Sequence, residues 1–186
     1  ARNAEAAKTS GRRPRAVAHT FGCQQNFADT ERIAGMLSEM GYDLSDDVND
    51  AELILYNTCA VREHAESRAL GNVGALTHVK KAHPETVIAL CGCMVQQKQV
   101  AEKVKKSYPH VDLVFGTHAL WRFPELLFRT LAENKRVFDI SGDEKGEIAE
   151  GLPVLRGKGA RAWLSIMYGC NNFCTYCIVP YVRGRE

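Results

Sequence analysis

The stretch Leu53-Ile54-Leu55-Tyr56-Asn57, followed at once by Thr58-Cys59, decides the fold. A short apolar run that ends abruptly in polar residues is typical of a strand buried on both faces of a parallel sheet. Four further short runs predict strands of the same sheet, and the middle ones are likewise apolar and β-branched. The predicted strands are 15–20, 53–57, 86–90, 111–115 and 136–140.

Amphipathic helices are predicted between these strands. Apolar residues at positions 33, 36, 37 and 40 recur with the period of one helix face, and Gly41 follows as a stop signal. The same period predicts helices that include 61–76, 100–108 and 120–131, and we interpret their apolar stripes as core packing. Strands that alternate with helices imply right-handed crossovers. The predicted fold is therefore α/β: a doubly wound, five-stranded, mainly parallel sheet with helices on both faces.

The composition is that of a globular protein. The chain has 186 residues, of which 45% are hydrophobic and 25% charged, and this excludes collagen-like, low-complexity and wholly disordered classes. The net charge is +2, but the first 15 residues are strongly basic, so the remainder is slightly acidic and is not a general nucleic-acid-binding surface. No apolar run approaches the roughly 18 residues of a membrane helix, and no charged segment leads into an apolar one in the pattern of a signal peptide. We therefore expect a cytoplasmic protein without a membrane partner.

Four regions are predicted along the chain. Residues 1–14 are polar and Arg-rich and are interpreted as a disordered leader, and 15–140 form the α/β domain. Residues 141–160 hold five glycines and are interpreted as a linker. Residues 161–186 begin a second, truncated domain, whose first strand is expected at 162–167. Because such a strand has an unprotected edge, we expect it to be disordered or to form a strand-swapped dimer.

The seven cysteines need a chemical role, because an odd number without a secretory signal is not a disulfide framework. Cys23, Cys59 and the pair Cys91 and Cys93 follow predicted strands and precede helices. Such positions share the carboxyl edge of a doubly wound sheet, where ligands bind and helix N-termini favour thiolates. We expect Cys23, Cys59 and Cys93 to converge there, and Cys91 to be a buried bystander. The alternative is a set of buried small apolar side chains. Asn26 is expected to cap the first helix, with a role at the cysteine site as the alternative.

A second, tighter set comprises Cys170, Cys174 and Cys177 in the stretch Cys-Asn-Asn-Phe-Cys-Thr-Tyr-Cys. Thiolates in a compact loop suit an iron–sulfur cluster or zinc. Structural zinc needs four protein ligands, and no second cysteine pair or nearby histidine follows. Three ligands leave one metal position open, which favours an iron–sulfur cluster able to bind a substrate or cofactor.

The spacing of this second set, after a predicted strand, resembles the signature of radical S-adenosylmethionine enzymes. The remaining motifs resemble those of methylthiotransferases, most of all the MiaB type, which acts on tRNA. The resemblance covers about residues 15–186, and Gln25 departs from the methionine usual in that type. Its motifs are Thr20-Phe21-Gly22-Cys23-Gln24-Gln25-Asn26, Asn57-Thr58-Cys59-Ala60-Val61-Arg62-Glu63, Gly92-Cys93-Met94-Val95-Gln96 and Ile178-Val179-Pro180-Tyr181-Val182-Arg183-Gly184-Arg185-Glu186.

The resemblance implies two 4Fe-4S clusters, one held by each cysteine set. The cluster of Cys170, Cys174 and Cys177 would bind S-adenosylmethionine at its open iron. Tyr176 resembles the position whose backbone lies near the cofactor adenine, and the alternative for its side chain is loop packing. The cluster of Cys23, Cys59 and Cys93 would be auxiliary, the place where a sulfur is carried and methylated.

The implied reaction inserts a methylthio group at carbon 2 of isopentenyl-modified adenosine beside the tRNA anticodon. This reaction implies no acid–base catalytic residue. It does imply an electron donor such as flavodoxin or ferredoxin. The full-length enzyme is expected to be a monomer that binds tRNA largely through regions outside this chain, and the fragment by itself to be inactive. Two alternatives remain: a methylthiotransferase for threonylcarbamoyl-adenosine in tRNA or for a ribosomal protein, and, more distantly, a cysteine-rich zinc or redox binding domain.

Overall fold

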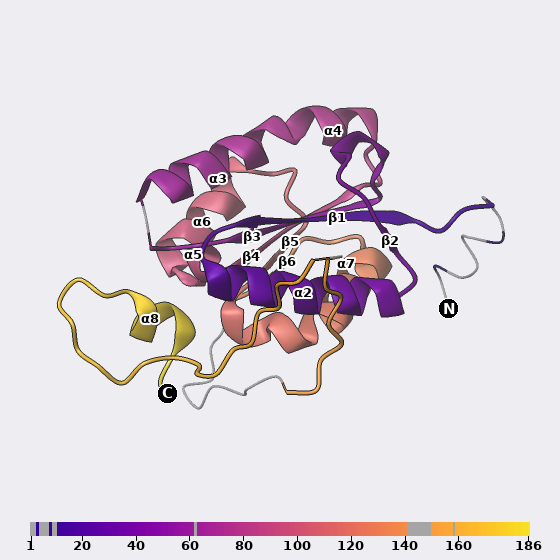
Figure 1. The fold of residues 1–186 in the computed structure, drawn as a ribbon. Coiled ribbons are helices and arrows are strands. Elements are labelled where there is room, and N and C mark those ends of the chain that lie inside the picture. The colour runs from indigo at the N-terminus through magenta and orange to yellow at the C-terminus, as the bar shows by residue number, and fades with distance from the viewer. Residues whose placement is uncertain (1–2, 4–7, 9–10, 62, 141–149, 158) are drawn as a thin grey trace.

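The computed structural model describes residues 3, 8, 11–61, 63–140, 150–157 and 159–186. At its centre is a parallel sheet with helices on both faces (Figure 1), which confirms the predicted α/β fold. Its strands are β1 (Arg15–Phe21), β2 (Asp43–Leu44), β3 (Leu53–Thr58), β4 (Val87–Gly92), β5 (Leu113–Phe115) and β6 (Val137–Asp139). They lie side by side in the order β2-β1-β3-β4-β5-β6.

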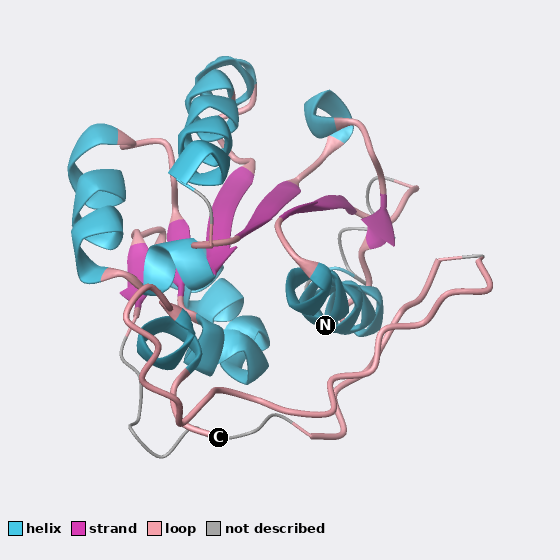
Figure 2. Cartoon of the chain, turned by 60° about the vertical axis from the view of Figure 1, so that its left-hand side comes forward, coloured by secondary structure: helices cyan, strands magenta, loops and turns pink. Residues whose placement is uncertain are grey.

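Helices form a layer on each face of the sheet. One layer holds α3 (Glu63–Ala75), α4 (Thr77–Ala82) and α6 (Lys98–Ser107), and the other holds α2 (Gln24–Glu39) and α7 (Phe123–Glu133) (Figure 1). Figure 2 shows the same two layers from a turned view. The shorter elements are α5 (Cys93–Gln96), α8 (Val179–Arg183) and the 3-10 turns η1 (Val48–Asp50) and η2 (Thr117–Arg122).

The apolar run of β3 explains why the sheet is buried on both faces. Leu53 and Leu55 pack into the core beneath α2 and α7, whereas Ile54 and Tyr56 pack into the core beneath α3 and α6. Side chains alternate between faces along a strand, so a strand covered on both sides has to be apolar throughout. Each such leucine or isoleucine contributes about 1.5–3 kcal/mol by leaving water.

The strand order places a crevice at one edge of the sheet. From β1 the chain winds outward through α2 to β2, and then returns across β1 to β3. The connections therefore diverge between β1 and β3, and ligands bind outside the carboxyl ends of strands at such a point. The register aligns Phe21 of β1 with Thr58 of β3 and with Gly92 of β4. Residues just beyond this row are brought together, although they are far apart in the sequence.

The sheet has six strands where the sequence predicted five, because β2 escaped detection. It is two residues long and both of its side chains are exposed, so no apolar run marks it. β4 also extends farther than predicted, to Gly92. Cys91 therefore lies within the strand, and Cys93 is the first residue of α5.

The structure has no strand at 162–167, where the apolar run had predicted one. This part of the chain runs beside α2, where Gln25 donates a hydrogen bond to Ser165 (Nε2 to Oγ, 3.0 Å) and the Phe27 and Trp163 rings stack at 6.2 Å. A strand requires backbone partners on a neighbouring strand, and this segment instead makes side-chain contacts with a helix.

The other predicted regions are described only in part. Positions 1–2, 4–7 and 9–10 of the leader, and 141–149 and 158 of the linker, lie outside the described residues. The described part of the linker packs on α2, where the Leu155 amide donates to the carbonyl of Glu31 at 2.9 Å. Of the helices described, none is long and apolar enough to cross a membrane.

Candidate functional site

Three cysteines from different strands line one cavity at the carboxyl edge of the sheet. Cys23 follows β1, Cys59 follows β3 and Cys93 follows β4, just beyond the aligned row of strand ends. Their cavity has a volume of about 200 Å³. Cys59 and Cys93 are buried and Cys23 is exposed. The cavity is also lined by Tyr168 and by residues of α8, among them Arg183.

A buried amide pair holds the first two cysteines in place. Cys23, rather than Asn26, is the N-cap residue of α2. Asn26 is the third residue of α2, and its side chain completes a capping box by accepting a hydrogen bond from the Cys23 amide at 3.3 Å. It also accepts from the Cys23 thiol at 3.3 Å and donates to Asn57 Oδ1 at 2.9 Å and to the Thr58 carbonyl at 3.1 Å. Asn57 donates back to the Asn26 carbonyl at 2.9 Å. Asn26 thus takes part in the cap of α2, as expected, and it also ties the start of α2 to the end of β3.

The cysteines of the cavity differ in acidity. The hydrogen bond from Cys59 lowers the pKa of the Cys23 thiol to about 5, although burial of the group acts in the opposite direction. The same contact, together with burial, raises the pKa of Cys59. Burial also raises the pKa of Cys93, despite the nearby Arg183 guanidinium. Within this set, Cys23 has the most acidic thiol, because its pKa is lowered while the pKa values of Cys59 and Cys93 are raised.

This difference predicts the order of thiol reactivity. The thiolate is the nucleophile, so Cys23 in the reduced, metal-free protein should be alkylated by iodoacetamide with a midpoint near pH 5. An ordinary cysteine has a midpoint of about 8.5. Peptide mass spectrometry of labelled samples gives the profile, and Cys59→Ala should raise the Cys23 midpoint. An ordinary thiol profile for Cys23 in the unchanged protein would contradict the prediction.

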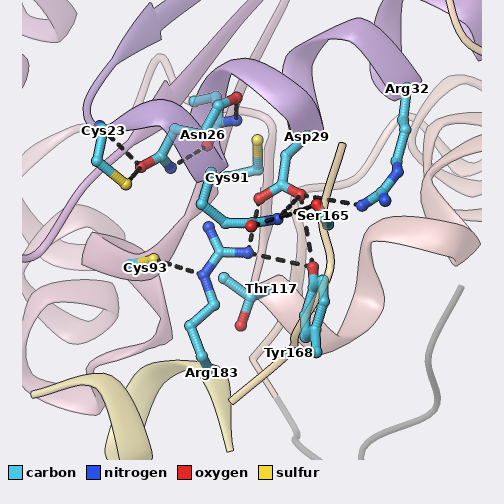
Figure 3. Close-up of polar contacts among 12 residues, drawn as sticks. Cys23, Asn26, Asp29, Arg32, Cys91, Cys93, Thr117, Ser165, Tyr168 and Arg183 are labelled. Carbon is cyan, nitrogen blue, oxygen red and sulfur yellow. Dashed lines mark hydrogen bonds and ion pairs between the residues drawn. The ribbon is translucent and has the colours of Figure 1, made fainter. Parts of the chain in front are cut away.

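A buried ion pair joins the cavity to the C-terminal part of the chain (Figure 3). Arg183 Nη1 lies 2.6 Å from Asp29 Oδ2, and its Nε donates to Cys93 Sγ at 3.0 Å. Nη1 also donates to the Tyr168 hydroxyl at 3.1 Å, and this hydroxyl donates to Asp29 Oδ1 at 3.5 Å. Burial by itself would lower the pKa of Arg183, but Asp29, Cys93 and Tyr168 raise it, so the guanidinium is fully charged. Burial, followed by the charge of Asp29, raises the pKa of Tyr168 to about 12.

The second cysteine set lies on a loop directly before α8. Cys174 is exposed, while Cys170 and Cys177 are partly buried. The loop is closed at its base, where the Cys170 amide donates to the Gly184 carbonyl at 3.1 Å. Tyr176 is 91% exposed, so its side chain does not pack the loop. In the part of the chain that the structure describes, no group of three or more Cys, His, Asp or Glu side chains is arranged to hold a single metal ion.

Comparison with known proteins places this cavity in a family. Residues 15–116 match the family described as Uncharacterized protein family UPF0004, which is more than half of the chain. The chain belongs to family UPF0004. The UPF0004 region contains Cys23, Cys59 and Cys93, whereas the second cysteine set and Arg183 lie outside it.

Individual relatives extend the similarity beyond the UPF0004 region. A protein of Acetivibrio thermocellus is 55% identical over 168 residues, covering 90% of this chain and 35% of the relative. A protein of Clostridioides difficile is 51% identical over 184 residues, covering 99% of this chain and 38% of the relative. Both are named tRNA-2-methylthio-N(6)-dimethylallyladenosine synthase. The chain thus spans little more than a third of these relatives' length, and the predicted resemblance to tRNA methylthiotransferases is confirmed.

Sequence reasoning missed the ion pair beside the UPF0004 cysteines. Asp29 precedes Ile33 by four residues and Met36 by seven, so it falls on the buried stripe of α2 and is 1% exposed. A charged residue on an apolar stripe needs a buried partner. The position of Asp29 on this stripe could therefore have predicted a buried ion pair from the sequence. Cys91 is buried in the core beneath α2 and α7 and does not line the cavity.

Proposed function

We propose that this chain is the amino-terminal part of an enzyme that inserts a methylthio group at carbon 2 of dimethylallyl-modified adenosine beside the anticodon of tRNA. The observation that carries the proposal is the convergence of Cys23, Cys59 and Cys93, from three strand ends, on one cavity. The names of the relatives support this substrate over threonylcarbamoyl-adenosine or a ribosomal protein. The reaction would take place in the cytoplasm, with an electron donor such as flavodoxin or ferredoxin.

The proposed organisation keeps the boundaries expected from the sequence. Residues 15–140 would be the cluster-binding domain, and 161–186 the opening of the radical S-adenosylmethionine domain. Residues 1–14 and 141–160 would be a leader and a linker. In the relatives, about two thirds of the length lies outside the matched region, so a tRNA-binding part would be sought there.

The donor atoms of the cavity suit a 4Fe-4S cluster. Cysteine thiolates are the usual ligands of such clusters, and Cys23, Cys59 and Cys93 offer three of them around a shared cavity. Three ligands leave one iron open for a further sulfur. The low pKa of Cys23 favours ligation by this residue, because a thiolate binds metal without first losing a proton. Cys59 and Cys93, whose pKa values are raised, would release their protons on binding. Burial of Cys59 and Cys93 would shield the bound group from water.

The second set would hold the other 4Fe-4S cluster, together with S-adenosylmethionine. Cys170, Cys174 and Cys177 supply three thiolates within one loop, and the exposed Tyr176 would lie beside the cofactor. When bound, these cofactors supply the radical and sulfur-transfer chemistry, because an aromatic C–H bond offers no useful acid–base route. The contribution of this chain is to bind the cofactors and to fix the two sites relative to each other through Tyr168 and Arg183.

Metal analysis after anaerobic reconstitution tests the proposal. Two cubane clusters require about eight iron and eight sulfide per chain, with the broad absorption typical of such clusters. A Cys170→Ala/Cys174→Ala/Cys177→Ala variant should retain about half of the iron, and so should a Cys23→Ala/Cys59→Ala/Cys93→Ala variant. Cys91→Ala is the matched control and should retain all of it. Binding of zinc only, or an equal loss of iron in the Cys91→Ala variant, would contradict the proposal.

A further inference from the structure

One nitrogen of the Arg183 guanidinium is unused. Nε donates to Cys93 and Nη1 contacts Asp29 and Tyr168, but Nη2 is buried and, among the residues described, has no hydrogen-bond partner. Figure 3 shows this nitrogen without a dashed line, on a side of the guanidinium that does not face Asp29 or Tyr168. Buried donors in proteins are nearly always paired, so an unpaired one on a buried cation points to a missing acceptor.

The surroundings of Arg183 indicate what that acceptor is. Of the described residues that line the cysteine cavity, Arg183 is the one basic residue. The others are the three cysteines, the polar Gln25 and Tyr168, and apolar residues or glycine. A buried cation that contacts a cysteine sulfur attracts an anionic, sulfur-containing group. Docking of α8 would require only the contacts of Arg183 Nη1 with Asp29 and Tyr168. It would not explain why Nε donates to Cys93, or why Nη2 is buried without a partner among the described residues.

Both ends of the second cysteine loop depend on the same contacts. Tyr168 precedes Cys170 and Arg183 follows Cys177, and both side chains meet Asp29 of α2. The Thr117 hydroxyl also donates to the Val182 carbonyl at 2.5 Å, which fixes the last turn of α8. The position of the guanidinium over Cys93 is therefore set by α2, by η2 and by the loop base together.

We propose that Arg183 is a positioning residue of the cysteine cavity, donating from Nε to the Cys93 sulfur and from Nη2 to a sulfide of the anionic iron–sulfur group that the three cysteines hold. The inference rests on the proposed function, since it requires that group to be bound. Hydrogen bonds to the sulfurs and nearby positive charge favour the more negative, reduced form of a cluster. Arg183 therefore raises the reduction potential of the first site, and Asp29 limits this effect by neutralising part of its charge.

A redox titration of the singly loaded chain tests this role. The Cys170→Ala/Cys174→Ala/Cys177→Ala background leaves the first site alone, and dithionite supplies the electron for its one-electron reduction. Arg183→Gln should shift the potential to more negative values, whereas Asp29→Asn should shift it to more positive values. Arg183→Lys keeps the charge but loses the forked donor, so its shift should be negative and smaller. Arg129→Gln, on the exposed side of α7, is the matched control and should leave the potential unchanged.

The outcomes separate this inference from the proposed function. Iron content is measured first: about four iron per chain in the background protein supports the function, and no iron overturns both proposals. With iron bound, equal potentials in all variants, or shifts of the same sign for Arg183→Gln and Asp29→Asn, overturn the role of Arg183 and leave the function standing. If Arg183→Gln does not fold, the opposite shifts of Arg183→Lys and Asp29→Asn decide the question.

Discussion

Replacement of Asp29 by alanine is expected to lower the free energy of unfolding by about 3–5 kcal/mol, because it leaves the Arg183 charge buried without a carboxylate. The two side chains are 2% and 7% exposed and their charged atoms lie 2.6 Å apart. The change also removes an acceptor of the Tyr168 hydroxyl and of the Gln25 amide. Urea unfolding of the reduced, metal-free protein, followed by circular dichroism, measures the effect.

An exposed ion pair provides the control for this prediction. Asp43 lies 3.2 Å from Arg13, and both side chains are about half exposed. Asp43→Ala should therefore cost at most about 1 kcal/mol. The double variant Asp29→Ala/Arg183→Ala should be less destabilised than the sum of its single variants, because it leaves no charge unpaired. Similar decreases in the free energy of unfolding for Asp29→Ala and Asp43→Ala would show that burial does not make the Asp29–Arg183 pair more important than an exposed pair.

The convergence of Cys23, Cys59 and Cys93 could be predicted because it follows from topology. Each cysteine comes just after an apolar run, and the carboxyl ends of parallel strands meet at one edge of the sheet. The Asp29–Arg183 pair could not be predicted in the same way. Its two partners come from α2 and α8, and no periodicity relates a helix to a five-residue turn of helix near the other end of the chain.

Local sequence pattern also gave wrong strand predictions where tertiary contacts determine the backbone conformation. The run at 162–167 has the composition of a strand, but the structure places it against α2 through Ser165 and Trp163. β2 has no apolar pattern, yet the parallel pairing of Asp43 and Leu44 with β1 makes it a strand. In both cases the partner available to the backbone, rather than the residues themselves, sets the outcome.

Gly92 is expected to be as sensitive as Asp29, for steric reasons. It joins β4 to α5 with φ 98° and ψ −168°, a conformation that is essentially restricted to glycine. A Cβ atom at this position would lie 2.3 Å from the Thr58 carbonyl oxygen and 2.4 Å from Asn57 Oδ1. Backbone strain of about 1–3 kcal/mol and overpacking of a similar size add up, so Gly92→Ala should lower the free energy of unfolding by about 3–5 kcal/mol.

Gly71 of α3 is the matched control, because a Cβ atom there meets nothing within 4 Å. Gly71→Ala should raise the free energy of unfolding by about 0.5–1 kcal/mol, as expected for alanine in a helix. Since Gly92 lies between Cys91 and Cys93, relief of the clash in Gly92→Ala has to move the Cys93 sulfur relative to Cys59. Reconstituted Gly92→Ala protein should therefore lose iron from the first site while Gly71→Ala retains it. A stable Gly92→Ala variant with full iron content would show that the junction of β4 and α5 does not set the position of Cys93.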